Sequence, residues 1–206
     1  MKRILVFSLL LCLAGAQAQQ NDTTESRRKI PTHFYKNDLK VTMLSLFSGS
    51  TKLTYERTFY NYYTRLDNSV EITGGVIGWG GDLLNHNHSK GGLCRLAYKF
   101  IFHFSEYPYS EPEHLLNGFY LKPEVAFSSF SYDSKDGMER LHNNRLAVMG
   151  CVGYQVVYKR FVFDIFGGLG AGIGDENEYN YYHGFIALPK GSPTAFTAGF
   201  KLGVAF

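Results

Sequence analysis

Long apolar runs, cysteine and tryptophan are scarce in this 206-residue chain. Beyond its first residues no run of about 18 apolar residues occurs, which excludes a membrane-spanning helix there. Three cysteines are too few for a disulfide-stabilised scaffold, since exported domains that depend on disulfides carry more. The formal net charge is only +3, so there is no electrostatic case for binding to nucleic acid. Function classes that need helical spans, dense disulfides or a basic surface are therefore excluded.

The start of the chain has the layout of a Sec-type export signal. A basic head of two residues precedes an apolar run over residues 4–13, and Ala16 and Ala18 provide the small residues of a cleavage site. The apolar run is too short to cross a bilayer as a helix. We predict that residues 1–18 are a signal peptide cleaved near Ala18. The polar and charged stretch 19–37 is then a flexible periplasmic leader.

After this leader, apolar and polar residues alternate along most of the chain. In the last segment Phe196, Phe200 and Leu202 share one face, while Thr197 and Lys201 share the other. A period of two is that of a β-strand and not of a helix. The same period recurs along the chain and predicts strands over 39–47, 51–60, 68–79, 91–104, 117–132, 143–158, 160–174 and 194–206.

Eight is an even number of strands, as in single-chain outer-membrane barrels, and most segments are long enough to cross a bilayer as tilted strands. We therefore predict an all-β fold over residues 38–206, an eight-stranded antiparallel up-and-down transmembrane β-barrel. The predicted external loops are 48–50, 80–90, 133–142 and 175–193. The predicted periplasmic turns are 61–67, 105–116 and 159–160.

The chemistry of the two strand faces separates this fold from a soluble one. A β-sandwich or a lipocalin-like barrel also alternates, but it turns its apolar face inward and a charged face to water. Here the polar faces are rich in glycine, alanine and serine, which suits a narrow lumen. Tyrosines gather near the expected strand ends, where membrane headgroups favour such rings. Cys94 and Cys151 fall on opposite faces, so we expect no disulfide between them.

Charged residues on the inward faces are the main candidate functional site. The interior of an eight-stranded barrel is barely wide enough for side chains, and buried charges must pair. We predict a lumen charge network of Glu56, Glu71, Arg95, Lys99, Lys122, Glu124, Arg145, Asp164 and Lys201. Its favoured interpretation is a salt-bridged plug, and the alternative is a narrow or gated ion path.

Two motifs suggest chemistry but have weak support. His103 and Ser105, at i and i+2, would share a strand face, as an acyl-transfer pair requires. The predicted topology places them at the periplasmic end, with no carboxylate to orient the histidine. Glycine at every second position over 168–174 forms one small strand face, whereas a phosphate-binding loop turns from strand to helix.

Two external loops carry residues that ligate metals elsewhere. The first group pairs two histidines with a carboxylate, and the second is a partial calcium-loop series. These candidate ligands are Asp82, His86 and His88 in one loop, and Asp133, Asp136 and Glu139 in the next. Such loops are more often simply solvated, and the second group lacks the full ligand series, so we expect no metal and no cofactor.

In its export signal and its final aromatic strand, the chain resembles the small eight-stranded outer-membrane barrels of Gram-negative bacteria. This is the OmpA/OmpX-like class, in a Bacteroidota-like version. The resemblance covers nearly the whole mature chain and is one of pattern. It implies that the last strand is the signal read by the barrel-assembly machinery. The matching positions here are Phe200, Leu202, Val204 and Phe206.

The sequence therefore predicts a non-enzymatic integral protein of the outer membrane, in contact with its lipid and lipopolysaccharide. Its role would be structural, or would lie in surface contact with a ligand through loops 80–90, 133–142 and 175–193, since loops on a rigid scaffold are common recognition sites. A lipid-modifying enzyme and a narrow small-solute channel are the alternatives. No nucleic-acid partner is expected.

Overall fold

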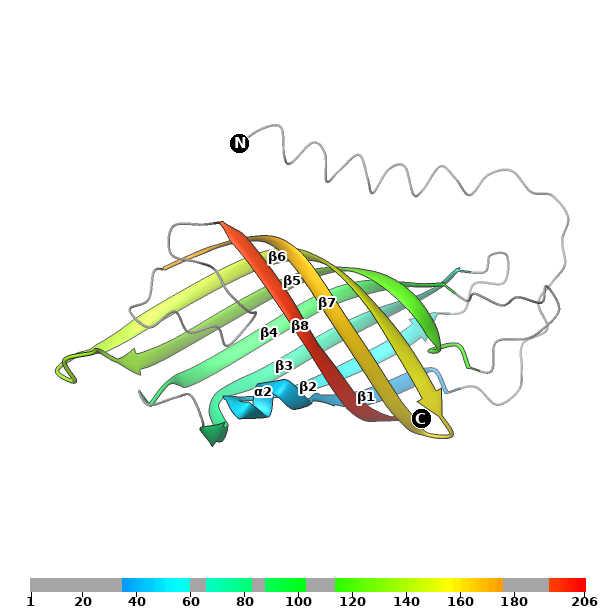
Figure 1. Cartoon of the computed structure of the whole chain (residues 1–206), viewed down its shortest axis with the longest axis horizontal. Helices are drawn as coiled ribbons and strands as arrows, with labels where there is room; N and C mark the ends of the chain where they lie inside the picture. Colours follow the sequence, from blue (N-terminus) through cyan, green and yellow to red (C-terminus); the bar gives the residue numbers. More distant parts are fainter. Residues whose placement is uncertain (1–34, 60–65, 83–87, 103–113, 176–192) are drawn as a thin grey trace, which may run out of the picture.

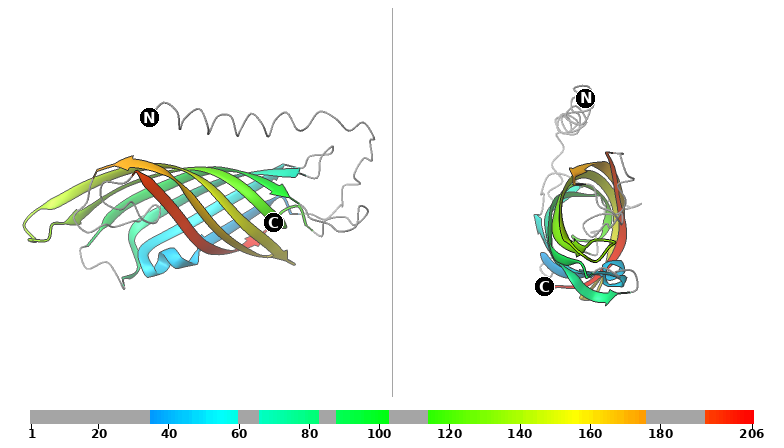
Figure 2. Two further views of the ribbon diagram at one scale, coloured as in Figure 1. Left: turned by 45° about the horizontal axis from the view of Figure 1, so that its top comes forward. Right: turned by 90° about the vertical axis from the view of Figure 1, so that its left-hand side faces the viewer.

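The computed structural model describes residues 35–59, 66–82, 88–102, 114–175 and 193–206. In this part of the chain eight antiparallel strands follow one another in sequence order around a closed barrel (Figure 1). Pairing of the first strand with the last closes the ring, which is visible along the barrel axis in Figure 2. The predicted all-β, up-and-down, eight-stranded barrel is confirmed.

The strand boundaries follow the alternation of the sequence closely. The elements are β1 (Asn37–Thr42), α2 (Met43–Phe47), β2 (Ser48–Phe59), β3 (Leu66–Asp82), β4 (Lys90–Phe102), β5 (Gly118–Asp133), β6 (Arg140–Tyr158), β7 (Phe161–Gly174) and β8 (Thr194–Ala205). We call the end where the first and last strands begin and finish the terminal end, and the opposite one the loop end. No helix in the described residues has the length and apolarity of a membrane span.

The first strand is shorter than predicted. We expected a strand over 39–47 and a loop over 48–50, but residues 43–47 form the helix α2 and β2 begins directly after it. The Ser45 hydroxyl donates to the Thr42 carbonyl at 2.6 Å, and this hydrogen bond stabilises the helical turn. Leu44 and Phe47, three residues apart, are both exposed, as expected for neighbours on a helix surface.

The seam of the barrel is the place where β1 joins β8 to β2. Because β1 is short, it closes only the half of this seam that lies nearer the terminal end. It pairs with β8 at residues 201–205 and with β2 at residues 53–57. Nearer the loop end, β8 and β2 have register partners only on their other sides, in β7 and β3. There α2 packs against β2, β3 and β8 and bridges the seam.

The last residue also takes part in closing the barrel. The Phe206 amide donates to the Asn37 carbonyl at 2.9 Å, and the Asn37 amide donates to the Phe206 carbonyl at 3.1 Å. The side chains of Leu202, Val204 and Phe206 are exposed on the outer wall. Phe200 stacks on Phe163 there, with ring centroids 6.3 Å apart.

The connections differ in length at the two ends. At the terminal end, β6 and β7 join through the predicted two-residue turn, in which Lys159 has a φ of 56°. At the loop end, the β5–β6 hairpin runs further than predicted, so the loop expected over 133–142 shrinks to 134–139. Gly137, with a φ of 65°, turns this hairpin, and its amide donates to the Ser134 carbonyl at 2.8 Å.

The two faces of the wall are distributed as the sequence predicts. Large apolar side chains such as Val148 and Phe163 are exposed outside, while charged and small side chains are buried inside. Cys94 is exposed and Cys151 is buried, and neither forms a disulfide.

Inward glycines make room for the ring of Tyr120 inside the barrel. A Cβ built on Gly153 would lie 2.4 Å from the Tyr120 ring, whereas one built on Gly167 would meet no atom within 4 Å. We expect Gly153→Ala to lower the free energy of unfolding by about 1–3 kcal/mol, because the Tyr120 ring and the Ile165 carbonyl, 2.5 Å from the added Cβ, would have to move. Urea unfolding measures the loss. Gly167→Ala is the matched control, and equal stability of the two variants would contradict the steric explanation.

Candidate functional site: the charged lumen

The structure places all nine charged residues of the predicted network inside the barrel. None of their side chains is more than 7% exposed. They come from seven of the eight strands, so the site exists only once the sheet has closed. These residues are Glu56, Glu71, Arg95, Lys99, Lys122, Glu124, Arg145, Asp164 and Lys201.

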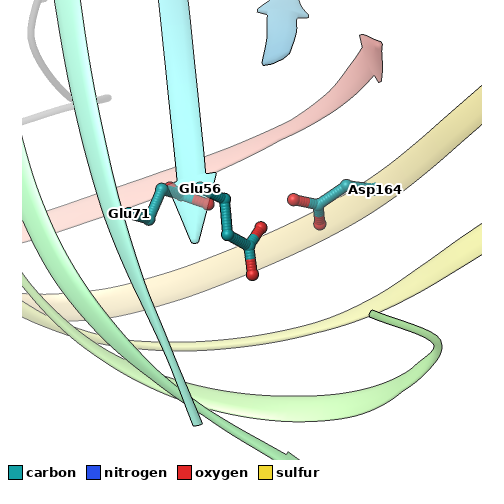
Figure 3. Close-up of side chains that lie close together, drawn as sticks. All are labelled: Glu56, Glu71 and Asp164. Carbon is teal, nitrogen blue, oxygen red and sulfur yellow. The ribbon is translucent and has the colours of Figure 1, made fainter. Parts of the chain in front are cut away.

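Three carboxylates meet at the centre of the lumen. Glu56 of β2, Glu71 of β3 and Asp164 of β7 point toward one another, with ligand oxygens within 4.8 Å (Figure 3). Glu56 and Glu71 are also direct neighbours in the β2–β3 register. Like charges placed opposite each other repel, so this arrangement requires cations close by.

Lysine ammonium groups surround these carboxylates. The Lys99 Nζ lies 2.8 Å from Glu56 Oε2, 3.1 Å from Glu71 Oε2 and 3.3 Å from Asp164 Oδ2. Lys122 and Lys201 approach the other Glu71 oxygen, at 3.0 and 2.6 Å. The places around Glu71 that a metal ion would need are taken by ammonium groups, so the cluster is an ion-pair network and not an open metal site.

Two further charged residues, from β1, complete this network. Lys40 pairs with Glu56 and lies 3.1 Å from Asp38 and 3.4 Å from Asp164. Four carboxylates (Asp38, Glu56, Glu71 and Asp164) thus meet four lysines (Lys40, Lys99, Lys122 and Lys201), and the central charges balance. We call these eight residues the central cluster.

Neutral side chains satisfy several further hydrogen-bonding groups of the central cluster, while Asp38 Oδ1 and Glu71 Oε2 accept no hydrogen bond from the described residues. The Tyr120 hydroxyl donates to Asp164 Oδ1 at 2.5 Å, and the Ser69 hydroxyl donates to Glu56 Oε1 at 2.5 Å. Gln155 accepts from Lys99 at 2.8 Å and donates to Asp38 at 3.1 Å. Buried hydrogen bonds of this kind rigidify a polar network.

Sequence reasoning missed Asp38, Lys40, Tyr120 and Gln155. Asp38 and Lys40 do alternate with apolar neighbours, but the predicted first strand began at residue 39 and was the least regular of the eight. Gln155 lay on the predicted inward face, but it carries no charge and so was not included in the predicted charge network. Tyr120 is an aromatic residue on an inward face, and only the position of Gly153 opposite shows that a ring fits there.

Beyond the central cluster, toward the loop end, lies a second layer of charge. Arg95 donates to Glu124 Oε1 at 2.9 Å and reaches Thr197 on β8 at 3.4 Å. Glu124 also pairs with Lys122 at 2.7 Å. Arg145 lies further toward the loop end and donates to the Asp175 carbonyl at 3.1 Å.

Apolar side chains cover this charged interior at the terminal end. Leu115 and Leu116, the last two residues of the long predicted turn 105–116, are fully buried. Leu116 packs with Val157, Val162 and Ala205. The end of this turn therefore closes the barrel. A second apolar cluster at the loop end comprises Ile77, Leu93, Phe130 and Tyr132.

His114 directly precedes Leu115 and Leu116 at the terminal end, and its titration gives the stability of the barrel a pH dependence. Its ring stacks on Tyr35, and its Nδ1 accepts from the Leu116 amide at 3.2 Å. Burial lowers the pKa of His114 to about 4, from an ordinary value near 6.5. The unfolded chain thus takes up a proton between these values while the folded protein does not, so stability is full above pH 6.5 and falls toward pH 4.

We expect this histidine to lower the free energy of unfolding by up to about 3 kcal/mol as the pH falls from 6.5 to 4. The measurement is urea unfolding at a series of pH values, for the wild type and for His114→Phe, which keeps a ring against Tyr35. The difference between their pH slopes isolates His114 from the carboxylates. Identical slopes for the two proteins would contradict the assignment.

The remaining candidates fare differently in the structure. His103 and Ser105 lie outside the described residues, as does His86, and of Asp82 only the backbone is described. The described Asp133, Asp136 and Glu139 are not grouped within ligand distance of one another. Asp133 instead lies 3.4 Å from His88 on the neighbouring hairpin.

The described lumen is therefore a charge-paired interior with an apolar cluster at each end. Comparisons with known protein families, with curated proteins and with solved structures found no match. The function is therefore inferred from the fold and the geometry of the lumen.

Proposed function

We propose that this chain is an integral outer-membrane β-barrel protein without enzymatic activity, exported by residues 1–18. Its lumen is plugged by the central cluster. Its role is structural, or lies in surface contact through the loop end. The barrel-assembly machinery inserts it by reading its last strand, and outer-membrane lipid and lipopolysaccharide surround it.

The observation that carries this proposal is the inverted polarity of the wall. Large apolar side chains from all eight strands are exposed outside, among them Val148, Ile165 and Leu96, each more than half exposed. Soluble proteins seldom expose a continuous apolar surface of this extent. A closed sheet satisfies its own backbone hydrogen bonds, which is what the interior of a bilayer demands.

Local features of the outer wall also suit lipid contact. A groove of about 520 Å³ lies on the outer wall beside Gly74, which has no side chain there, and Leu53, Ile72 and Trp79 line it. An acyl chain is the occupant that such an apolar, membrane-facing groove favours. Tyr158 and Phe161 at the terminal end and Trp79 toward the loop end are strongly exposed, as residues of aromatic belts are.

The paired lumen favours a plug over a channel. An open ion path needs water around its charged groups, whereas Lys40, Glu56 and Asp164 here are fully buried and in contact with one another. Moving an ion through would require several of these pairs to separate at once. The alternative of a lipid-modifying enzyme gains no support from the described residues.

Membrane fractionation combined with heat-modifiable gel migration tests the location. We expect the mature chain in the outer-membrane fraction, with a folded form that migrates differently before and after boiling. Planar-bilayer recording tests the plug, and we expect no stable conductance step. A protein found dissolved in the periplasm would refute the membrane proposal, and steady open-channel currents would refute the plug alone.

A further inference from the structure

We propose that the outer wall binds one anionic phospholipid, with an acyl chain in the groove over β1–β3 and the headgroup phosphate at Arg57. The site lies on the face where β1, β2 and β3 are neighbours (Figure 1). The inference rests on the membrane location of the proposed function and goes beyond it, because it names the class of lipid and the residue that selects it.

The groove runs along the strands from the terminal end toward the loop end. Its terminal rim is formed by Leu39 of β1 and Tyr55 of β2, which are register partners, and Trp79 of β3 lies at its other end. Ile72 is the register partner of Tyr55 on β3, and Trp79 follows it seven positions later, about 23 Å along an extended strand. An apolar groove of this length fits one extended acyl chain.

Arg57 is the next outward residue of β2 beyond the terminal rim of the groove. It follows Tyr55 on the same strand face and lies opposite Asn37 of β1. Arg57 is exposed, and its guanidinium group forms no hydrogen bond or ion pair with the described residues. Arginine presents a planar set of N–H donors that can bind two phosphate oxygens at once. Arg57 is therefore available to a headgroup whose acyl chain lies in the groove.

The charges around Arg57 favour an anionic headgroup over a zwitterionic one. The exposed charged side chains among the described residues of the terminal end are all cationic, namely Lys36, Arg57, Lys159 and Arg160. The described acidic side chains at this end are buried and face the lumen, namely Asp38 and Asp67. The terminal carboxylate of Phe206 supplies one negative charge against these four cations. Such a surface attracts anionic lipid and repels the cation of a zwitterionic headgroup.

Among these four cations, Arg57 is the one that shares a strand face with the groove. Arg160 donates to the Tyr35 hydroxyl at 3.0 Å, and Lys159 lies over the Tyr158 ring, 5.6 Å from its centroid. Both belong to the β6–β7 turn, away from the groove. Lys159→Gln therefore removes a positive charge from the same end of the barrel and is the matched control for Arg57→Gln.

Gly74 provides a second, independent variant, which tests the groove itself. It lies on the outward face of β3 and lines the groove, and a Cβ built on it would meet no atom within 4 Å. A leucine side chain at this position would therefore occupy the groove without a clash against the wall. Gly167 on β7 is equally open and lies outside the groove, so Gly167→Leu is the matched control.

Native mass spectrometry of the full mature chain in detergent tests the proposal, in titrations with phosphatidylglycerol or phosphatidylcholine of identical acyl chains. We expect the wild type to retain one lipid and to bind phosphatidylglycerol about three- to tenfold more tightly than phosphatidylcholine. Arg57→Gln should lose most of this preference and keep its affinity for phosphatidylcholine. Lys159→Gln should keep the preference of the wild type.

The groove variant should change lipid binding in a different way. Gly74→Leu should weaken the binding of both lipids by about tenfold, because their common acyl chain loses its apolar contacts. Gly167→Leu should bind both lipids as the wild type does. Heat-modifiable migration shows whether each variant is folded, and Arg57→Gln decides the headgroup assignment even if Gly74→Leu does not fold.

Equal affinity of the wild type for the two lipids would overturn the proposal. An unchanged preference in Arg57→Gln, or unchanged binding in folded Gly74→Leu, would do the same. A lipid-free dimer as the main species would assign the groove to a second copy of the chain and would also overturn it. In each case a chain that still fractionates with the outer membrane loses only this site, whereas a chain dissolved in the periplasm refutes the proposed function.

Discussion

Val148→Arg should destabilise the barrel in a lipid bilayer by about 2–4 kcal/mol, the cost of an arginine on the lipid face near the midplane. Val148 lies near the middle of β6 and is 58% exposed on the outer wall. At an exposed position in water the same change would have almost no effect. Urea unfolding in lipid vesicles therefore measures what the outer wall contacts.

The matched control for this change is Met138→Arg. Met138 is 89% exposed in the β5–β6 turn, well away from the strand centres. We expect it to alter the free energy of unfolding by less than about 0.5 kcal/mol, as surface substitutions do. Equal and small effects for both variants would mean that the wall faces water, and the membrane proposal would fail.

Glu71→Gln should be at least as damaging, with a loss of about 3–5 kcal/mol, as observed when one partner of a buried ion pair is removed. Glu71 contacts Lys99, Lys122 and Lys201 and lies 3.8 Å from Lys40, so its neutralisation leaves four lysines facing three carboxylates. The same urea unfolding experiment measures this loss.

Two further variants show whether charge imbalance is the cause. Glu139→Gln, on the exposed hairpin turn, removes the same charge where solvent screens it and should change little. The double variant Glu71→Gln with Lys201→Met restores equal numbers of lysines and carboxylates and should recover part of the loss. A single-variant effect below about 1 kcal/mol would contradict a plug held by paired charges.

Much of the barrel could be predicted from the sequence because one physical rule, alternation between two environments, governs nearly every strand. This rule correctly assigned residues as distant in the sequence as Lys99 and Lys201 to the inward face of the barrel. The rule failed at residues 43–47, since Leu44 and Leu46 also flank Ser45 in a pattern that fits a strand. In the structure these residues instead form a helix, in which the Ser45 hydroxyl donates to the Thr42 carbonyl.

The partners inside the lumen could not be predicted in the same way. Alternation shows that Glu56 and Asp164 point inward, but not that Lys99 joins them. Which side chains meet in the lumen depends on the tilt and stagger of the strands. The closed barrel sets both as a whole, and no local sequence pattern encodes them.

The short β1 has a consequence for how the barrel opens. Where α2 replaces the strand, the backbone of β8 from residue 194 to 200 is held by strand pairing on one side only. Amide protons along that edge should exchange with deuterated solvent sooner than those of β5 and β6, which pair along most of their length. The weakest part of the barrel wall is therefore the edge of β8 along residues 194–200. Thr197, whose hydroxyl accepts a hydrogen bond from Arg95 of β4 in the lumen, belongs to this segment.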